Sequence, residues 1–575
     1  MTQVLQRDSL REAVARVWPA LLLAVVLNAP WLASSMFLDD WHLLWKAHEA
    51  EWTWHSLSSS FTFLDSASIS TWNLGEIPAY HYFRPLIIAS FKVEMWLWGL
   101  SPVGFHAVSL LLHLVSTVLV GALVFAMKGE RRLARVGALL FAIQPHNVAS
   151  VLWTAGRTEV LAAPLVLAAL LCFVAYTRRP LRRMQVGALL FTAVACFVKE
   201  SVVLVGGFAL LWEVHLGRTL KTPLRQWFKV AVPRLTPLAL LLGGYLAYRF
   251  LVFDSGATLR EPYFTDPASW SFPLFALAKT VHYLTALLLT IPIVPIFGTQ
   301  FLLDHPVLLL LSLTLVTAAL WLGARKANRN RLSALCLGWL AISFLPTLPI
   351  LASDLYPYFA GIGFAMLLAG VVGSDTRRAR IALVSLVALY CLSYSARGLL
   401  YHTQGSYHAA AMADVEEDLG TPTPPGTRLL LINMPVSVSH LASHLRLRSG
   451  HGDVRAILAT VTPSWVIPTS GPRLLCTSDR TVRIFPSEGH DTLFDTSEEW
   501  NLQLFRLPLQ QGKSYTTPYG FTATPLWAGD KVLALDLSFD NPLSIGSHRL
   551  YSFYLDDSGL AHPVCTETEA GREKL

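Results

Sequence analysis

Apolar runs of about twenty residues recur along the first 400 residues of this chain. Two of them are WPALLLAVVLNAPWLASSMF (18–37) and VSLLLHLVSTVLVGALVFAM (108–127). Runs of roughly 20 apolar residues match the thickness of the hydrocarbon core of a bilayer. Only 14% of the 575 residues are charged, against about 25% in ordinary soluble domains. A soluble protein could not bury so much apolar surface, so the sequence predicts a polytopic α-helical membrane protein.

The length criterion gives about eleven membrane spans. They are 18–37, 108–127, 133–151, 159–176, 183–198, 201–215, 235–253, 305–323, 332–350, 356–373 and 380–399. Basic loops face the cytoplasm in most membrane proteins, and every basic loop falls on one side if the N-terminus is cytoplasmic. The basic loops are 128–135, 177–185, 215–229, 324–331 and 375–380.

Residues 272–296 are also apolar, but the charges of the flanking loops require an even number of crossings there. The prolines of the IPIVP stretch would break a helix. We therefore expect a re-entrant or interfacial element, or a tight hairpin.

The composition changes after about residue 400. We predict a transmembrane domain over 1–400, a linker over 401–426 and a β-rich extracytoplasmic domain over 427–575, because short apolar runs separated by Gly, Pro, Asn and Asp are typical of strands. Cys476 and Cys565 share this last domain and are either disulfide-bonded or two free thiols. The cytoplasmic loops explain the net charge of +7, so no nucleic-acid partner is implied.

Charged residues gather at the outer ends of the predicted spans. Ionisable groups at membrane depth are costly, and they are functional-site candidates by default. The adjacent Asp39 and Asp40 follow the first span directly. The other candidates are Tyr82, Arg84, His146, Arg157, Glu159, Lys199, Glu200, Arg249, Asp354 and Tyr358. Each has a structural alternative, because carboxylates can end a span, arginines can snorkel to the interface, and Lys199–Glu200 can be a solvated loop pair.

Several motifs occur in a recognisable order: FLDDW, YFRPL, GLSPVGFH, FAIQPHN followed by GRTEVLA, KES, YLAYRF and SDLYPYFAGIGF. Over residues 15–400 the chain resembles the GT-C glycosyltransferases. It looks closest to the protein O-mannosyltransferases that carry tetratricopeptide repeats, and to their bacterial relatives. The repeats are absent here, and the β-rich domain stands in their place. The resemblance implies a GT-C-like transmembrane catalytic domain.

The resemblance also implies a reaction, which is inverting transfer of a sugar from a polyprenyl-phosphate donor to a hydroxyl acceptor. One carboxylate, Asp39 or Asp40, would act as general base, as an alcohol nucleophile requires. Arginines matching Arg84 and Arg157 would face the donor phosphate, since guanidinium groups bind phosphate oxygens in forked geometry. Arg249 and Lys199 are further candidates for phosphate binding. Which aspartate is the base stays open at this stage.

The chain departs from the family pattern in two places. The His-Pro-x-His-x-Glu pattern appears as Gln144, Pro145, Asn147 and Ala149, and the Glu-Arg pair before the tyrosine appears as Asp354–Leu355. These departures leave the metal requirement unknown: no cofactor is certain, and a divalent metal is compatible with the sequence.

The expected partners are a polyprenyl-phosphate-linked sugar, a hydroxyl acceptor on protein, glycan or lipid, and the lipid bilayer. The expected location is the bacterial inner membrane, with a cytoplasmic N-terminus and a periplasmic C-terminal domain. Two alternatives remain. One is a non-catalytic scaffold that binds lipid-linked sugar. The other is a transporter or flippase, which predicts ionisable residues deep in several spans and internal symmetry between two halves; the sequence shows neither.

Overall fold

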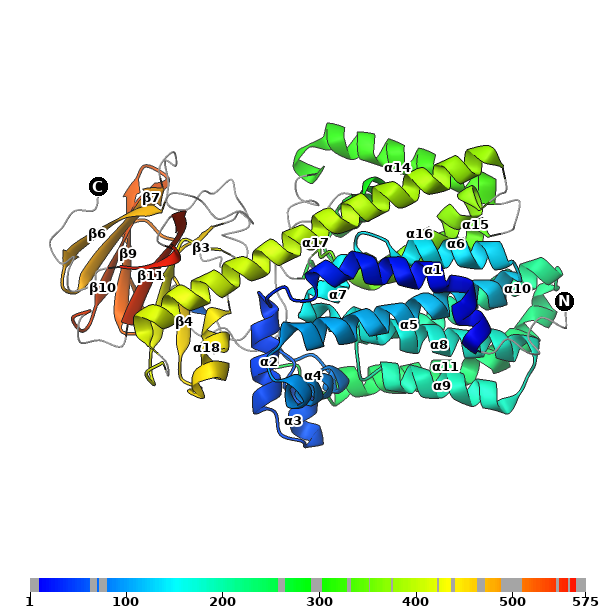
Figure 1. Ribbon diagram of the computed structural model, residues 1–575, viewed down its shortest axis with the longest axis horizontal. Helices are drawn as coiled ribbons and strands as arrows, with labels where there is room; N and C mark the ends of the chain where they lie inside the picture. Colours follow the sequence, from blue (N-terminus) through cyan, green and yellow to red (C-terminus); the bar gives the residue numbers. More distant parts are fainter. Residues whose placement is uncertain are drawn as a thin grey trace.

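The protein is described by a computed structural model that covers residues 10–62, 70–71, 80–256, 264–290, 302–327, 332–350, 352–373, 376–420, 423–435, 440–462, 471–487, 509–543, 548–556 and 559–564. A bundle of long helices forms one part of the molecule and a domain of strands forms the other (Figure 1). The N-terminal end of the first helix lies at the end of the bundle that is farther from the strands (Figure 1).

Each of the eleven predicted spans contains a helix. The long bundle helices are α1 (Leu10–Asn28), α5 (Pro102–Lys128), α6 (Arg131–Ala142), α8 (Arg157–Arg178), α9 (Arg182–Ala195), α10 (Leu204–Leu220), α11 (Leu224–Leu251), α12 (Phe272–Leu289), α14 (Pro306–Ala327), α15 (Ser333–Phe344), α16 (Pro357–Val372) and α17 (Arg377–Leu419). Among the described residues, seven helices are long and apolar enough to cross a membrane, and three shorter apolar helices accompany them. The chain is therefore an integral membrane protein of the polytopic helical class.

One prediction changes at α12. Residues 272–289 form a single continuous helix that is long and apolar enough to cross a membrane. A tight hairpin within these residues is therefore wrong. The helix ends before the IPIVP stretch, as the prolines predict, and residues 291–296 lie outside the described residues.

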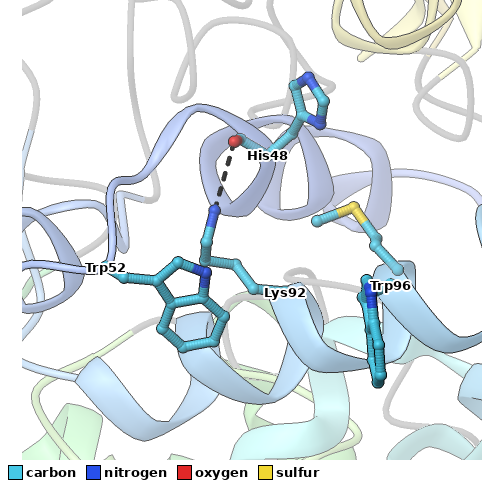
Figure 2. Close-up of a pocket in the computed structure, with 5 residues that line it drawn as sticks. His48, Trp52, Lys92 and Trp96 are labelled. Carbon is cyan, nitrogen blue, oxygen red and sulfur yellow. Dashed lines mark hydrogen bonds between the residues drawn. The ribbon is translucent and has the colours of Figure 1, made fainter.

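Three shorter helices lie between α1 and α5, in the segment that we expected to be the first outer loop: α2 (Asp39–Glu49), α3 (Trp54–Ser59) and α4 (Pro85–Trp98). A lysine of α4 closes the C-terminal end of α2, because Nζ of Lys92 donates to the backbone oxygens of Ala47 at 3.0 Å and His48 at 3.4 Å. A cation at this end satisfies carbonyl groups that the helix leaves unpaired. Figure 2 shows Lys92 between α2 and the indole rings of Trp52 and Trp96. These contacts fix α2 on α4.

Short turns connect the bundle helices at the outer end. They are η1 (Ala29–Trp31), α7 (Asn147–Leu152), η2 (Thr154–Gly156), η3 (Glu200–Val203) and η5 (Leu345–Thr347). Several of the charged residues predicted from the sequence lie on or beside these turns.

The strand-rich prediction for the C-terminal region is confirmed. Its elements are β2 (Arg428–Ile432), β3 (Met434–Pro435), α18 (Leu441–Ser449), β4 (Arg455–Leu458), β5 (Val461–Thr462), β6 (Pro472–Ser478), β7 (Thr481–Ser487), β8 (Tyr515–Thr516), β9 (Phe521–Ala528), β10 (Lys531–Phe539), β11 (His548–Asp556) and β12 (Gly559–Pro563). One sheet has the order β1-β4-β2-β11-β12 and a second has the order β6-β7-β10-β9-β8. The first sheet includes β1 (Ser70–Thr71), which comes from the first outer loop and pairs in parallel with β4.

The central strand β2 is apolar on both faces, as expected for a buried strand with parallel neighbours. Leu430 and Ile432 pack in the core between the two sheets, with Val482 of β7. Leu429 and Leu431 pack on the opposite face against α17 and α18. The first sheet therefore lies between the second sheet and two helices.

The helix α17 joins the bundle to the strand domain (Figure 1). Residues 401–419, which we expected to belong to a linker, continue this helix without interruption. The reason is that Ala411, Met412 and Val415 are buried in the core of the strand domain, so tertiary packing extends the helix beyond the apolar run. Cys476 is disulfide-bonded, and Cys565 lies outside the described residues.

Candidate active site

The two adjacent aspartates begin α2. The residue before them, Leu38, has φ 53° and ψ −132°, a strained conformation that costs about 1–3 kcal/mol and is common at functional sites. Asp40 is fully buried. Its Oδ1 accepts a hydrogen bond from the backbone N–H of Ala155 at 2.7 Å, and its Oδ2 accepts one from Phe37 at 3.3 Å. Asp40 therefore anchors α2 to the η2 turn.

The two carboxylates differ in their surroundings. Burial raises the pKa of Asp40 well above its ordinary value, against the backbone hydrogen bonds that lower it. The Asp39 side chain is 15% exposed, and its Oδ1 lies 3.2 Å from Nε2 of His440, just before α18. Its Oδ2 makes no hydrogen bond with any residue that the structure describes. Of the pair, Asp39 is the carboxylate that a substrate can reach.

Arg84 precedes α4 and binds Glu200 at the start of η3. Its Nε and Nη2 donate to Oε2 of Glu200 at 3.2 and 2.9 Å. The guanidinium also stands over the rings of Phe61 and Tyr82, 4.6 and 4.4 Å from their centroids, where cation–π attraction holds it. Within the described chain, the other carboxyl oxygen of Glu200 is buried and has no hydrogen-bond partner. This pair therefore retains unused capacity to bind a polar ligand.

A second ion pair lies next to the first. Lys199 binds Glu159 of α8, and Nζ of Lys199 lies 5.2 Å from the ring centroid of Tyr356. The Tyr356 side chain interacts electrostatically with four charged residues, Arg84, Glu159, Glu200 and Asp39. Tyr356 therefore lies beside Lys199, within electrostatic range of Arg84 and of Asp39.

Arg249, in the last turn of α11, joins the same region. Its Nη1 donates to Oγ of Ser255 at 2.7 Å and its Nη2 to the hydroxyl of Tyr80 at 3.3 Å. Its Nε is buried and has no hydrogen-bond partner among the described residues. Arg249 also interacts electrostatically with Glu200. We call the set Tyr82, Arg84, Glu159, Lys199, Glu200, Arg249 and Tyr356 the outer cluster.

The structure places Arg157 inside the bundle. Its side chain is 0% exposed and pairs with both carboxyl oxygens of Glu94 on α4. It also donates to Oγ of Ser109 at 3.1 Å and to the backbone oxygen of Phe105 at 2.8 Å, both on α5. Contact with a donor phosphate would require this network to open. Arg84 and Lys199 are also paired with carboxylates but are 13% and 10% exposed, so the full enclosure of Arg157 is what argues against the expectation that it faces the donor.

Tyr358 is likewise buried in the bundle. Its hydroxyl lies 2.7 Å from Nδ1 of His113, whose Nε2 lies 3.0 Å from the backbone oxygen of Ala142. The neighbouring Tyr356, in the same SDLYPYF motif, reaches the outer cluster instead. The motif contains both tyrosines, and sequence alone could not show which of them lies beside Lys199.

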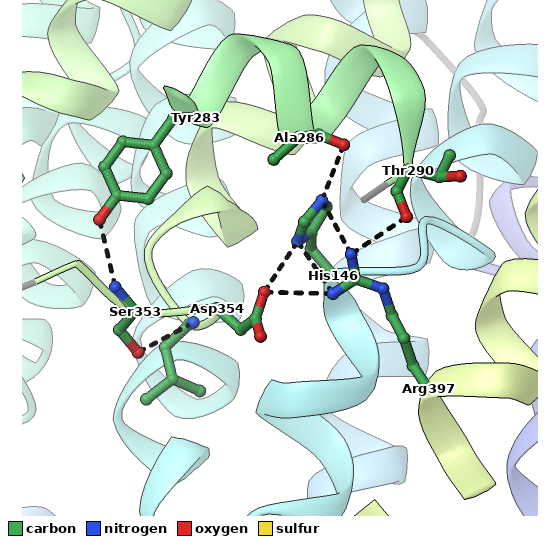
Figure 3. Close-up of polar contacts among 8 residues, drawn as sticks. His146, Tyr283, Ala286, Thr290, Ser353, Asp354 and Arg397 are labelled. Atoms are coloured by element: carbon green, nitrogen blue, oxygen red, sulfur yellow. Dashed lines mark hydrogen bonds and ion pairs between the residues drawn. The ribbon is translucent and has the colours of Figure 1, made fainter. Parts of the chain in front are cut away.

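His146 and Asp354 meet around an arginine that the sequence reading missed. Nη1 of Arg397, from α17, lies 3.1 Å from Oδ1 of Asp354 and 3.2 Å from Nδ1 of His146. Its Nη2 donates to the backbone oxygen of Thr290 at the end of α12 (Figure 3). The signal was available, because Arg397 is a cation inside the predicted span 380–399. This buried triad ties α7, α12, α17 and the segment before α16 together.

In the part of the chain that the structure describes, no group of three or more His, Cys, Asp or Glu side chains is arranged to hold a metal ion.

Known proteins share part of this sequence, although no family model matches it. Human protein O-mannosyl-transferase TMTC4 is 26% identical over 364 residues, which are 52% of this chain and 48% of that protein. Human protein O-mannosyl-transferase TMTC1 is 39% identical over 106 residues, 18% of this chain and 12% of that protein. The chain resembles the protein O-mannosyltransferases. The resemblance inferred from the ordered motifs is thereby confirmed, and the chain spans about half the length of TMTC4.

Two solved structures align with weaker likeness. ArnT from Cupriavidus metallidurans, bound to undecaprenyl phosphate, has a TM-score of 0.40 and 12% identity over 78% of this chain and 86% of that chain. An oligosaccharyltransferase from Archaeoglobus fulgidus, tethered with an acceptor peptide, has a TM-score of 0.39 and 12% identity over 77% of this chain and 63% of that chain.

Proposed function

We propose that this protein is a membrane glycosyltransferase that moves a sugar from a polyprenyl-phosphate donor to a hydroxyl acceptor, with inversion at the anomeric carbon. The observation that carries the proposal is that the ion pair of Arg84 and Glu200 lies at the start of α4, and α4 packs against α2, the helix that begins with Asp39. The similarity to protein O-mannosyl-transferases supports the same reaction class.

The outer cluster is suited to an anionic phosphate. Its cations Arg84, Lys199 and Arg249 outnumber its carboxylates Glu159 and Glu200. Guanidinium groups bind phosphate oxygens with directed hydrogen bonds and stay charged. The aromatic rings around Arg84 exclude water, which strengthens these interactions. Because Arg157 is fully enclosed between α4 and α5, we assign it to bracing these helices and not to the phosphate.

In the proposed reaction, Asp39 acts on the acceptor and the outer cluster binds the donor phosphate. The acceptor hydroxyl gives its proton to the free oxygen of Asp39, and the acceptor oxygen forms a bond to the anomeric carbon of the sugar. The bond between that carbon and the phosphate oxygen breaks, and its electron pair leaves with the phosphate. General base catalysis of this kind contributes about 10²–10⁴-fold. Cations beside the departing phosphate stabilise the charge that develops on it.

We further propose the orientation of the protein. The basic loops support a cytoplasmic N-terminus, and the outer cluster and the strand domain would then lie on the periplasmic side of a bacterial inner membrane. Exposed tryptophans on α3 and α4, such as Trp54 and Trp96, suit the membrane–water interface. A lipid-linked donor would then reach the outer cluster from within the bilayer.

The direct test is turnover of a panel of polyprenyl-phosphate sugars by the purified protein, with Asp39→Asn as the inactive comparison. We expect release of polyprenyl phosphate from at least one donor, and a loss of about 10²-fold or more in the variant. Donor binding without turnover would instead support a non-catalytic scaffold. Movement of the intact donor across a vesicle membrane would support a flippase. Either result would overturn the proposal.

A further inference from the structure

The strand domain meets the candidate active site at one helix. The helix α18 packs on α2, the helix that carries the two aspartates. His440 lies just before α18; its side chain is 6% exposed and its Nε2 lies 3.2 Å from Oδ1 of Asp39. A residue from beyond the membrane bundle thus stands against the carboxylate that we assign as the base.

Several specific contacts hold α18 in this place. The ring of Trp41 stacks on His444 with centroids 3.4 Å apart, and Nδ1 of His444 lies 3.1 Å from Nε2 of His408 on α17. The guanidinium of Arg446 stands over the Trp45 ring at 4.3 Å. The helices α2, α17 and α18 therefore form a specific interface. Its stacked aromatic rings fix the distance between the strand domain and α2.

The outer loop is also tied to the strand domain by its backbone. The strand β1 pairs in parallel with β4, with Ser70 opposite Ile457 and Thr71 opposite Leu458. The strand domain thus holds α2, which carries the two aspartates, and β1, which follows it in the chain. A base must sit within hydrogen-bond reach of the proton that it abstracts, so whatever fixes α2 also fixes the position of Asp39.

We propose that His440 is a positioning residue for sugar transfer: it holds one oxygen of Asp39 and leaves the other oxygen aimed at the acceptor, so that the strand domain forms part of the active site. The inference rests on the proposed function. His440 contacts Asp39 and not the donor. Loss of His440 should therefore lower the rate of the chemical step and leave the binding of the donor at the outer cluster unchanged.

The kinetic test uses the full-length protein, with undecaprenyl-phosphate mannose as the probe and release of undecaprenyl phosphate as the readout. We expect His440→Leu to lower kcat by about tenfold or more, with the KM for the donor unchanged within about twofold. His440→Gln, which keeps a hydrogen-bond donor, should recover part of kcat.

His444→Phe is the matched control. It keeps the stacking on Trp41 and removes the contact with His408, so it weakens the same interface without touching Asp39. We expect it to lower the melting temperature and, at an equal loss of stability, to lower kcat much less than His440→Leu does, because the contact between His440 and Asp39 remains. If His444→Phe lowers kcat as much as His440→Leu does at an equal loss of stability, His440 has only a structural role and the proposal is overturned.

A substrate-free measurement separates this proposal from the proposed function. The melting temperatures of Asp39→Asn, His440→Leu and the double variant form a cycle, and shifts that are not additive show that the two residues interact. Additive shifts overturn the positioning role whatever the activity. A wild-type protein that turns over no polyprenyl-phosphate sugar, together with shifts that are not additive, overturns the proposed function and with it the catalytic meaning of the contact.

Discussion

The two aspartates have the same chemistry but different environments, and this separates their expected roles. Asp40 is enclosed and bound by two backbone N–H groups, whereas Asp39 keeps one oxygen without a hydrogen-bond partner among the described residues. Sequence alone could not assign a separate role to each aspartate. Their environments are set by the η2 turn and by His440, which are distant in the chain.

Substitution of each aspartate tests this division. Asp39→Asn should lose about 10²-fold or more in kcat and keep its stability. Asp40→Asn keeps an oxygen that can accept the hydrogen bond of Ala155, so it should keep most of its activity. Asp40→Ala leaves that N–H buried and unpaired, which costs about 1–3 kcal/mol. Donor turnover and thermal unfolding in detergent measure these effects. The opposite ranking of the two Asn variants, at unchanged stability, would make Asp40 the base.

The buried pair of Arg157 and Glu94 gives a prediction about stability. Arg157→Met leaves the Glu94 carboxylate buried without its partner, which costs about 3–5 kcal/mol. The double variant Glu94→Gln/Arg157→Met removes both charges and should recover much of that loss. Thermal unfolding of the purified variants measures both.

The control for this prediction is Arg448→Met. Arg448 is 49% exposed and pairs with Glu416, and exposed pairs contribute about 0–1 kcal/mol. A small effect of Arg157→Met, equal to that of Arg448→Met, would contradict the structural role and return Arg157 to the phosphate candidates.

At the scale of the helices, the contact between α2 and α18 is rich in histidine. Burial lowers the pKa of His42 well below its ordinary value, and the nearby His440, Lys46 and Arg446 lower it further. Burial also lowers the pKa of His444, with further contributions from His408 and Arg448. Both histidines are therefore neutral when the two helices are in contact.

Acidification should consequently loosen this contact. The unfolded pKa of histidine is about 6.5, and the folded values are lower, so the folded state binds fewer protons. The stability that these histidines contribute is present above about pH 6.5 and is lost as the pH falls toward the folded values. Hydrogen exchange of the α18 amides, corrected for the intrinsic effect of pH, should show less protection at about pH 5 than at about pH 7.5. His444→Phe should weaken this pH dependence, and equal protection at both pH values would contradict it.

The helices also show how far sequence carries the fold. Apolar length located a helix in every predicted span, because the bilayer imposes that length directly. It misjudged residues 401–419, because the helix is extended there by packing of Met412 and Val415 in the strand domain, which no local pattern reveals. The position of charged residues at span ends identified Arg84, Glu200 and Lys199 as site candidates. The sequence could not show that Arg157 pairs with Glu94, because Glu94 lies on another helix.

At the scale of the whole molecule, α17 is the connection that couples the bundle to the strand domain. The Asp414 carboxylate accepts hydrogen bonds from the backbone N–H groups of Leu560 at 2.7 Å and Ala561 at 2.8 Å in β12. Asp418 accepts one from the hydroxyl of Tyr551 at 2.6 Å. The helix α17 thus carries Arg397 of the buried triad and binds β12, one edge strand of the first sheet. The opposite edge strand of that sheet is β1.

If α17 sets the position of the strand domain, weakening the contact between α17 and β12 should change the position of His440 at the candidate active site. Asp414→Ala removes the acceptor of two backbone hydrogen bonds, and each lost bond costs about 0.5–1.5 kcal/mol. We expect increased proteolysis of the strand domain and a lower kcat, since His440 then holds Asp39 for a smaller fraction of the time. The exposed Glu417, one turn along the same helix, supplies the control, because Glu417→Ala should change neither quantity. Loss of protease resistance in Asp414→Ala with full kcat would show that the bundle alone positions the base.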